Sequence, residues 1–336
     1  MRRYYIIFFS LLLISCSKQS ESLQPNTPVG NFEALWQIVD EKYCYFDEKN
    51  IDWDAIHDQY LPQIEVLDAK DERALFRVLA SMLDSLRDGH VNLYSDFDVS
   101  HTTSWYDSLP VNYSSTLISN YLSDYQTAGG LYYTRIANDR IGYIRYSSFE
   151  SSFTARNMWY VLDYFADCQG LIVDVRSNGG GNDDYAYKLA STFFENSETV
   201  GYWQHKTGKG HNDFSELQPI EVDASLMQCK WLRPVAVLIN SRCYSATNSF
   251  ANAMRYAPYA TLVGGQTGGG GGLPMSYELP NGWLIRLSSV PMYDRDKRSI
   301  EGGIQPNVAV NLTDAMTAQG KDDLIEKAIE ILLSEK

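Results

Sequence analysis

The stretch Leu171-Ile-Val-Asp-Val-Arg-Ser-Asn-Gly-Gly-Gly181 is a short apolar run that ends in three consecutive glycines. An uninterrupted apolar run of this length is typical of a β-strand buried on both faces, as in a parallel sheet. Residues 183–194, which follow, are predicted to form a helix. The same order returns downstream, where residues 234–239 predict a strand, 240–244 a turn and 245–256 a helix. Strands that alternate with helices predict an α/β fold with a largely parallel sheet.

Further elements extend this core in both directions. Strands are predicted at 132–136, 141–146 and 260–263, helices at 155–165 and 322–334, and a hairpin around Pro280-Asn-Gly282. We therefore expect an α/β core over residues 131–336. Upstream, apolar residues recur with helical spacing, which predicts a small helical N-terminal domain over residues 31–90. Residues 91–130 show no strong period and are expected to be a connecting region of loop and irregular strand.

The N-terminus has the pattern of an export signal. Arg2 and Arg3 precede an apolar run of about eleven residues that ends at Ser15-Cys16. The run is shorter than the roughly twenty residues that span a bilayer. Its end resembles the bacterial lipobox, so we expect a signal peptide at 1–15, a lipid on Cys16 and a polar tether over 16–30. The protein would then be exported and anchored to a bacterial membrane, on its periplasmic side or at the cell surface. A plain signal peptide with an incidental cysteine is the alternative.

The charge balance and the cysteines limit the possible partners. The chain has 28 basic and 42 acidic residues, a net charge of −14, which becomes −16 without the two signal arginines. This excess of acidic residues argues against electrostatic binding of the protein to nucleic acid. The other four cysteines are widely scattered without the spacing of a zinc site, so disulfides and free thiols both stay open: Cys44, Cys168, Cys229 and Cys243.

Ser245 stands where a buried strand is predicted to turn into a helix. Its hydroxyl would lie at the positive end of the helix dipole, beside backbone N–H groups that have no partner within the helix. Such groups can stabilise a developing oxyanion. From the local sequence alone, a serine that simply caps the helix is the more common outcome.

Two further positions carry functional potential. The glycines after Asn178 let a substrate backbone approach closely, and the lysine and the following Ser/Thr of a phosphate-binding loop are absent there. The alternative is a flexible turn. His90 follows the turn signal Asp88-Gly89, and an imidazole is suited to accept a proton from a serine nucleophile. A lone histidine is more often structural or merely exposed.

Taken together, five segments resemble the C-terminal processing (tail-specific) serine peptidases and their tricorn-core relatives. The segments follow in the family's order: Leu86-Arg-Asp-Gly-His90, the strand and glycines 171–181, the nucleophile segment 235–251 with Tyr-Ser-Ala-Thr-Asn, Leu262-Val-Gly-Gly-Gln-Thr-Gly268, and Ile300-Glu-Gly-Gly-Ile-Gln-Pro306. The resemblance implies a Clp protease/crotonase-like core of stacked ββα units. It also implies a serine-type peptidase that cleaves protein or peptide substrates by acyl-enzyme chemistry, which requires no cofactor and no metal.

The resemblance assigns the site residues, with two departures from the family pattern. Bacterial processing enzymes pair the serine with a lysine in a G-K-G segment, but residues 268–272 are all glycine. The tricorn branch uses a serine, a histidine and a glutamate, which implies Ser245 as nucleophile, His90 as base and Glu301 as its support. Gly89 replaces the serine that links histidine and glutamate there, so Glu301, Asp88 or a water is left to orient His90. The second departure is that residues 91–140 are too few for the PDZ domain of many members.

The oxyanion would be held by the N–H groups of Ala246 and of Gly179 or Gly180. Two alternatives remain at this stage. One is a catalytically silent family member that binds peptides or apolar ligands in the cleft, as the retinoid-binding relatives of the eye do. The other is Cys243 as nucleophile, two residues before the helix begins.

Overall fold

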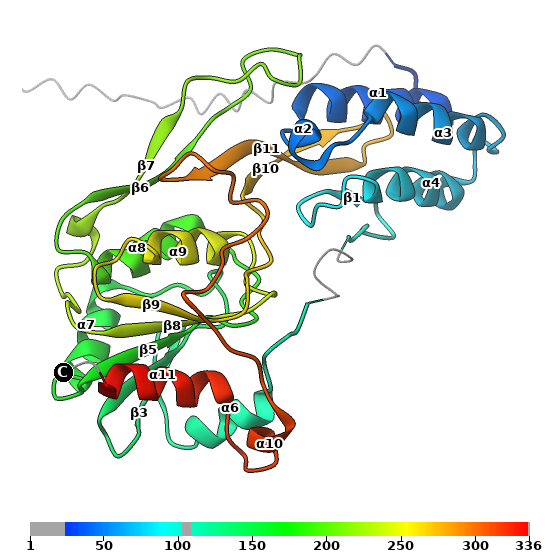
Figure 1. Ribbon diagram of the computed structural model, residues 1–336. Coiled ribbons are helices and arrows are strands. Elements are labelled where there is room, and N and C mark those ends of the chain that lie inside the picture. The colour runs from blue at the N-terminus through cyan, green and yellow to red at the C-terminus, as the bar shows by residue number, and fades with distance from the viewer. Residues whose placement is uncertain (1–23, 103–108, 335–336) are drawn as a thin grey trace, which may run out of the picture.

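The centre of the protein is a seven-stranded sheet in the order β12-β9-β8-β5-β4-β3-β2, seen in the computed structural model, which describes residues 24–102 and 109–334 (Figure 1). Its strands are β2 (Gln126–Ala128), β3 (Leu131–Ile136), β4 (Ile141–Arg145), β5 (Gly170–Asp174), β8 (Val235–Ile239), β9 (Ala260–Gly264) and β12 (Val308–Ala309). The pairs from β4 to β12 are parallel, and β2, β3 and β4 pair antiparallel. The predicted α/β fold with a largely parallel sheet is confirmed.

Helices cover both faces of this sheet (Figure 1). On one face lie α7 (Ala155–Tyr164), α8 (Asp183–Ala190) and α9 (Ala246–Met254), and on the other α6 (Ser115–Tyr121) and α11 (Asp323–Ser334). Two 3-10 turns, Ser191–Phe193 and Ala224–Leu226, and the short α10 (Asp314–Thr317) complete the core.

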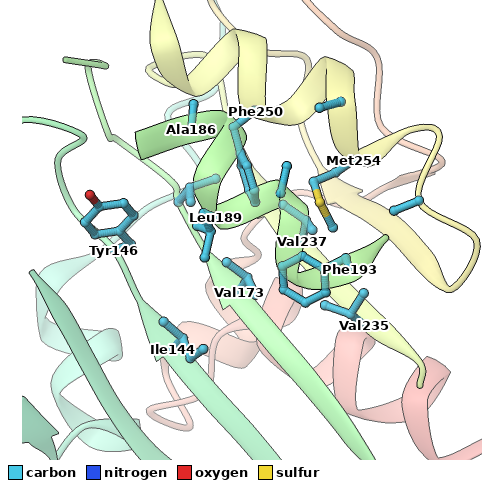
Figure 2. Packing of buried hydrophobic residues seen from close by; sticks show 14 of the residues in the cluster. Ile144, Tyr146, Val173, Ala186, Leu189, Phe193, Val235, Val237, Phe250 and Met254 are labelled. Atoms are coloured by element: carbon cyan, nitrogen blue, oxygen red, sulfur yellow. The ribbon is translucent and has the colours of Figure 1, made fainter. Parts of the chain in front are cut away.

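The two covered faces explain the uninterrupted apolar strands. Val173 and Val237 pack toward Leu189 and Phe250 of the helices, as Figure 2 shows, whereas Ile172 packs on the α11 side. Because alternate strand residues point to opposite faces, both sets must be apolar. The turn after β8 therefore projects from a rigid, fully buried element.

The N-terminal part is helical with a sheet beneath it. Its helices are α1 (Pro28–Lys42), α2 (Phe46–Lys49), α3 (Trp53–Glu65) and α4 (Glu72–Asp84). They pack on β1 (Asn92–Tyr94), β10 (Gly272–Glu278) and β11 (Leu284–Asp294). In the same five-stranded sheet, the far end of β11 pairs with β6 (Glu198–Trp203), which pairs with β7 (Gln218–Val222). The predicted helices and the β10–β11 hairpin are present. The hairpin lies against the N-terminal helices although its sequence is within the predicted core.

Several details differ from the sequence-based expectations or settle them. Helix α1 begins at Pro28, inside the stretch 16–30 that was expected to be a tether, because Thr27 caps it by accepting a hydrogen bond from Gly30 N. Strands β6 and β7 were not predicted.

All four cysteines of the described chain are free thiols. Within the described residues no helix has both the length and the apolar character needed to span a bilayer. Cys16 and the signal segment lie outside the described residues.

Candidate active site

Ser245 occupies the turn between β8 and α9 in a strained conformation. Its φ of 57° and ψ of −125° lie outside the regions that an ordinary residue adopts. Its N–H donates to Gly269 O at 2.9 Å, which helps to hold the strained turn. As the N-cap residue it makes no side-chain capping hydrogen bond. The capping interpretation is therefore not what the structure shows, and the hydroxyl is left for another partner.

That partner is His90. Its Nε2 lies 3.0 Å from Ser245 Oγ. Asp88 Oδ1 accepts a hydrogen bond from the His90 backbone N–H at 2.9 Å, and the imidazole packs against the Tyr244 ring at a centroid distance of 4.9 Å. His90 comes from the segment between α4 and β1, whereas Ser245 comes from the core. The two residues that sequence reasoning chose are brought together across the contact between the two parts of the chain.

His90 is a neutral imidazole at neutral pH. Burial lowers its pKa to about 4, because the charged form loses its hydration. Asp88 acts in the opposite direction, while the positive charges of Arg286 and Lys49 add to the lowering. Nδ1 is buried without a well-formed hydrogen bond among residues 24–102 and 109–334, although the backbone of Gly272 is near enough to the ring to favour its protonated form. A neutral histidine with Nε2 at a serine hydroxyl is ready to accept a proton.

Glu301 does not contact His90. Its Oε1 lies 2.8 Å from Lys49 Nζ, and its Oε2 accepts a hydrogen bond from Gly271 N at 2.9 Å. Of the two routes left open by Gly89, direct support and a relay, a direct contact from Glu301 to His90 is therefore absent from the described structure. The physical reason is that a buried ammonium takes one carboxylate oxygen and a backbone N–H takes the other. Glu301 belongs to the site through Lys49.

Lys49, at the end of α2, was missed by sequence reasoning. Its ammonium donates to Arg87 O at 3.1 Å and contacts carboxylate oxygens of Glu301 at 2.8 Å and of Asp88 at 3.4 Å. Asp88 also accepts a hydrogen bond from the Tyr43 hydroxyl at 3.0 Å. Since Asp88 binds the His90 backbone, Lys49 ties Glu301 to the base through Asp88. No spacing or motif around residue 49 marks it in the sequence.

The two carboxylates share one cation, and this sets their protonation. Lys49 and the His90 backbone N–H hold the pKa of Asp88 below its usual value despite burial. Burial, followed by the negative charge of Asp88, raises the pKa of Glu301 to about 8. Glu301 is therefore the carboxylate that takes a proton first. Asp88 stays ionised and keeps its hydrogen bonds to the His90 segment.

The glycine turn after β5 lies against the nucleophile. A Cβ added to Gly180 would stand 2.8 Å from Ser245 Cβ and 3.0 Å from Ala246 N, so only glycine fits at this position. Gly180 N–H is already engaged, since it donates to Asn178 Oδ1 at 2.9 Å. Gly179 faces open space, and in the described part of the chain its N–H and that of Ala246 donate no recorded hydrogen bond. These two N–H groups, unlike that of Gly180, are therefore free to donate to another acceptor.

The rival nucleophile is unsuited to the task. The Cys243 thiol is buried, and its Sγ donates to Val175 O at 3.1 Å. Burial raises its pKa to about 12. A thiol acts as a nucleophile only in its thiolate form, so Cys243 is a structural residue.

The chain is similar in sequence to known peptidases. Residues 140–310 match peptidase family S41, and residues 25–84 match the tricorn protease C1 domain. The carboxy-terminal processing protease CtpA of Bacillus subtilis is 26% identical over 185 residues, which are 54% of this chain and 37% of that protein. The chain thus spans less than half the length of the curated relatives that it matches.

Two solved structures extend the comparison to the whole described chain. A candidate peptidase from Parabacteroides merdae is 46% identical, with a TM-score of 0.87, over 92% of this chain and 98% of its own. The tricorn protease has a TM-score of 0.54 at 16% identity, over 92% of this chain and 37% of its own, and shares the fold. The predicted Clp protease-like architecture is confirmed, with its helical N-terminal region. Because the S41 match covers half of the chain and includes the Ser245 segment, the protein belongs to peptidase family S41.

Proposed function

We propose that the protein is a serine peptidase that cleaves peptide bonds of proteins or peptides, with Ser245 as nucleophile and His90 as base. The observation that carries this proposal is the 3.0 Å separation between Ser245 Oγ and a buried, neutral His90 Nε2. That distance is within the range required for proton transfer between a nucleophile and its base. Membership of family S41 supports the same reaction class.

The reaction proceeds by acyl transfer. Ser245 Oγ attacks the scissile carbonyl carbon while His90 Nε2 accepts the hydroxyl proton. The N–H groups of Ala246 and Gly179 stabilise the oxyanion, and each such donor is worth about 3 kcal/mol in the transition state. His90 then returns the proton to the leaving amine, which departs with the C-terminal part of the substrate. Water, activated by His90, releases the acyl group from Ser245.

Glu301 and Lys49 act at one remove from the reacting atoms. Lys49 holds Asp88, and Asp88 fixes the His90 backbone through its N–H. We assign Lys49, Asp88 and Glu301 as positioning residues, because none of their side chains contacts the imidazole. This arrangement substitutes for the serine bridge that Gly89 removes.

A silent binding protein is the second candidate, and two features argue against it. The turn at Ser245 is strained, and strain of this kind is retained where surrounding contacts enforce it for function. His90 is buried at a cost in free energy with its Nε2 directed at that serine. Neither feature is needed to line a passive ligand cleft.

The protein is also proposed to be exported and anchored by a lipid on Cys16. Only the sequence supports this, because the residues concerned lie outside the described structure. Growth of expressing bacteria with an alkyne fatty acid should label the wild type and not Cys16→Ser. Equal labelling of both would contradict the anchor.

Digestion of a diverse peptide library, followed by mass spectrometry, tests the activity. The wild type should generate new peptide ends, and Ser245→Ala should generate none above background. Ser249→Ala is a matched control, since Ser249 lies one turn further along α9 and is also buried. Cleavage by Ser245→Ala at the wild-type rate would exclude the proposed nucleophile.

A further inference from the structure

Arg286 is a second cation beside the catalytic histidine. It lies on β11 directly opposite Asn92 of β1 and Ser276 of β10, and Asn92 is two residues beyond His90. The guanidinium is near enough that its positive charge lowers the pKa of His90. Arg286 therefore lies one strand away from the base.

Its side chain points away from the N-terminal helices. Ile285 and Leu287, on either side of it, belong to the buried cluster formed with those helices. Because side chains alternate along a strand, Arg286 shares the opposite face with Leu284 and with Tyr94, the partner of Leu284 on β1. Leu284 and Tyr94 are 44% and 36% exposed. A cation thus stands on an accessible face with apolar neighbours, next to the site.

Arg286 has no carboxylate partner among the described residues. Within residues 24–102 and 109–334 its one hydrogen bond runs from Nη1 to the neutral amide oxygen of Asn92, at 3.5 Å. Glu278 is on the same face but forms no ion pair with it, and Asp88 is already held by Lys49. By contrast, the buried Arg176 contacts both Asp174 and Asp322. In a chain with 42 acidic and 28 basic residues, a half-buried arginine without an acid is available for an external anion.

The direction of the reaction decides which part of a substrate would meet this residue. The inference rests on the proposed function, in which His90 protonates the leaving amine. The base must then lie on the side where the C-terminal part of the substrate departs. Arg286 is on the His90 side of the site, on the strand that pairs with β1 directly after the base. We propose that Arg286 binds a carboxylate of the peptide substrate, downstream of the bond that is cleaved.

A guanidinium suits this role because its planar fork donates two parallel hydrogen bonds to a carboxylate. The carboxylate has two sources in a peptide: the free C-terminus, or an Asp or Glu side chain in an internal sequence. The first would make the protein trim short C-terminal pieces, and the second would select acidic sites within a chain. The experiment separates them.

Binding to the uncleaving Ser245→Ala variant provides the test. Three pools of fluorescent decapeptides are compared by anisotropy: free C-terminal acid without Asp or Glu, the same pool as C-terminal amide, and amide with one Asp near the C-terminus. We expect the acid pool or the Asp pool to bind about tenfold to a hundredfold more tightly than the plain amide pool, as for a charged hydrogen bond. Which pool is preferred identifies the source of the carboxylate.

Variants in the same Ser245→Ala background assign the preference to Arg286. Arg286→Gln should abolish it, and Arg286→Lys should keep part of it. Arg140→Gln is the matched control, because it removes the same charge from an exposed turn at the far end of β4. Equal affinity for all three pools, including no binding of any, or an unchanged preference in Arg286→Gln, overturns the proposal.

Failure of this proposal is distinguishable from failure of the proposed function. Covalent labelling of Ser245 by a small fluorophosphonate does not require a substrate carboxylate. Labelling without any carboxylate preference would sink the Arg286 site alone. A carboxylate preference that depends on Arg286, without labelling, would keep the anion site and refute the peptidase.

Discussion

At the scale of single residues, burial dominates the chemistry of His90. Asp88 is adjacent and favours the protonated imidazole, yet loss of hydration and the charges of Arg286 and Lys49 outweigh it, so the pKa falls to about 4. A histidine with an unperturbed pKa would give an acid limb of activity at about pH 6–7. The structure moves that expectation downward.

The first prediction concerns this acid limb. A base must be neutral to accept a proton, so kcat/KM should stay near its maximum as the pH falls and decrease only through about pH 4. The lowered pKa also costs stability between pH 6.5 and 4, where the unfolded chain binds a proton that the folded chain does not. Tryptophan fluorescence over the same range monitors unfolding. A midpoint near pH 6.5 in a folded enzyme would contradict this account.

The second prediction compares two neighbouring glycines. Gly180 has a φ of +104° and its added Cβ would meet Tyr244 O at 2.7 Å, whereas Gly179 has open space around it. We expect Gly180→Ala to lower the free energy of unfolding by about 1–3 kcal/mol, the usual cost of enforced strain. Gly179→Ala should change it by less than about 0.5 kcal/mol. Urea denaturation measures both, and equal losses would show that the close approach of Gly180 to Ser245 is incorrect.

At the scale of elements, the short helix α2 contributes more than its length suggests. Lys49 at its end is the single cation that contacts both Asp88 and Glu301 in the described part of the chain. Its side chain is 13% exposed, so these contacts are largely shielded from water. Removing one partner of such a group leaves buried charge uncompensated, which costs more than the pair contributes.

The third prediction follows from this cluster. Lys49→Met should lower the free energy of unfolding by about 3 kcal/mol or more at neutral pH. The loss should shrink as the pH falls, because protonation of Asp88, the carboxylate that stays ionised beside Lys49, then removes the uncompensated buried charge. Lys42→Met is the control, since Lys42 is 32% exposed and contacts Glu41 at 3.7 Å, an interaction worth less than about 1 kcal/mol. Equal losses of unfolding free energy in the two variants at pH 7.5 would show that Lys49 stabilises the fold no more than an exposed lysine does.

The elements also show what local sequence can and cannot predict. The β8 strand and the α9 helix were predictable because an apolar run followed by a turn has few other interpretations, and Ser245 came with them. Strands β6 and β7 were not, because most of their residues are partly or fully exposed and they carry Gly, Pro and Glu instead of a clean alternation. Lys49 could not be found either. Its role arises from contacts with residues 39 and 252 positions away, which no local pattern encodes.

At the scale of the whole molecule, the site depends on how the N-terminal part meets the core. The hairpin of β6 and β7, seen extending above the core in Figure 1, reaches the N-terminal helices with its loop. His211 Nε2 lies 2.6 Å from Asp40 Oδ1, and its ring stacks on Phe46 at 4.3 Å. Lys209 Nζ contacts Glu41 Oε1 at 2.8 Å. These contacts join the loop to α1 and α2, in the part of the chain that also supplies His90.

The fourth prediction tests this loop. His211→Ala removes the stack and the contact with Asp40, together worth about 1 kcal/mol, so kcat/KM should fall about fivefold. Hydrogen exchange should quicken in α1 and α2 and stay unchanged in β5 and β8. His205→Ala is the control, because His205 lies in the same loop and contacts Trp203 of its own hairpin. An effect of His205→Ala as large as that of His211→Ala would exclude the loop as a link.

The sequence predicted the fold class and the family, but not the domain organisation that makes the site. The hairpin β10–β11 belongs to the core in sequence and to the N-terminal helices in space, where Leu279 and Ile285 join their cluster. Motif order identified Ser245 and His90 as partners. Asp88 was one of three groups that the sequence left open beside His90, and only the three-dimensional arrangement shows its contact with the His90 backbone and the pairing of Lys49 with Asp88 and Glu301.

The central claim is that Ser245 is a nucleophile activated by His90, and covalent labelling tests it most directly. A fluorophosphonate should add one adduct to the folded wild type, mapped by mass spectrometry to Ser245, with none on Ser245→Ala and a strongly slowed reaction of His90→Ala. Absence of an adduct on the wild type, or an unchanged adduct on Ser245→Ala, would contradict the account.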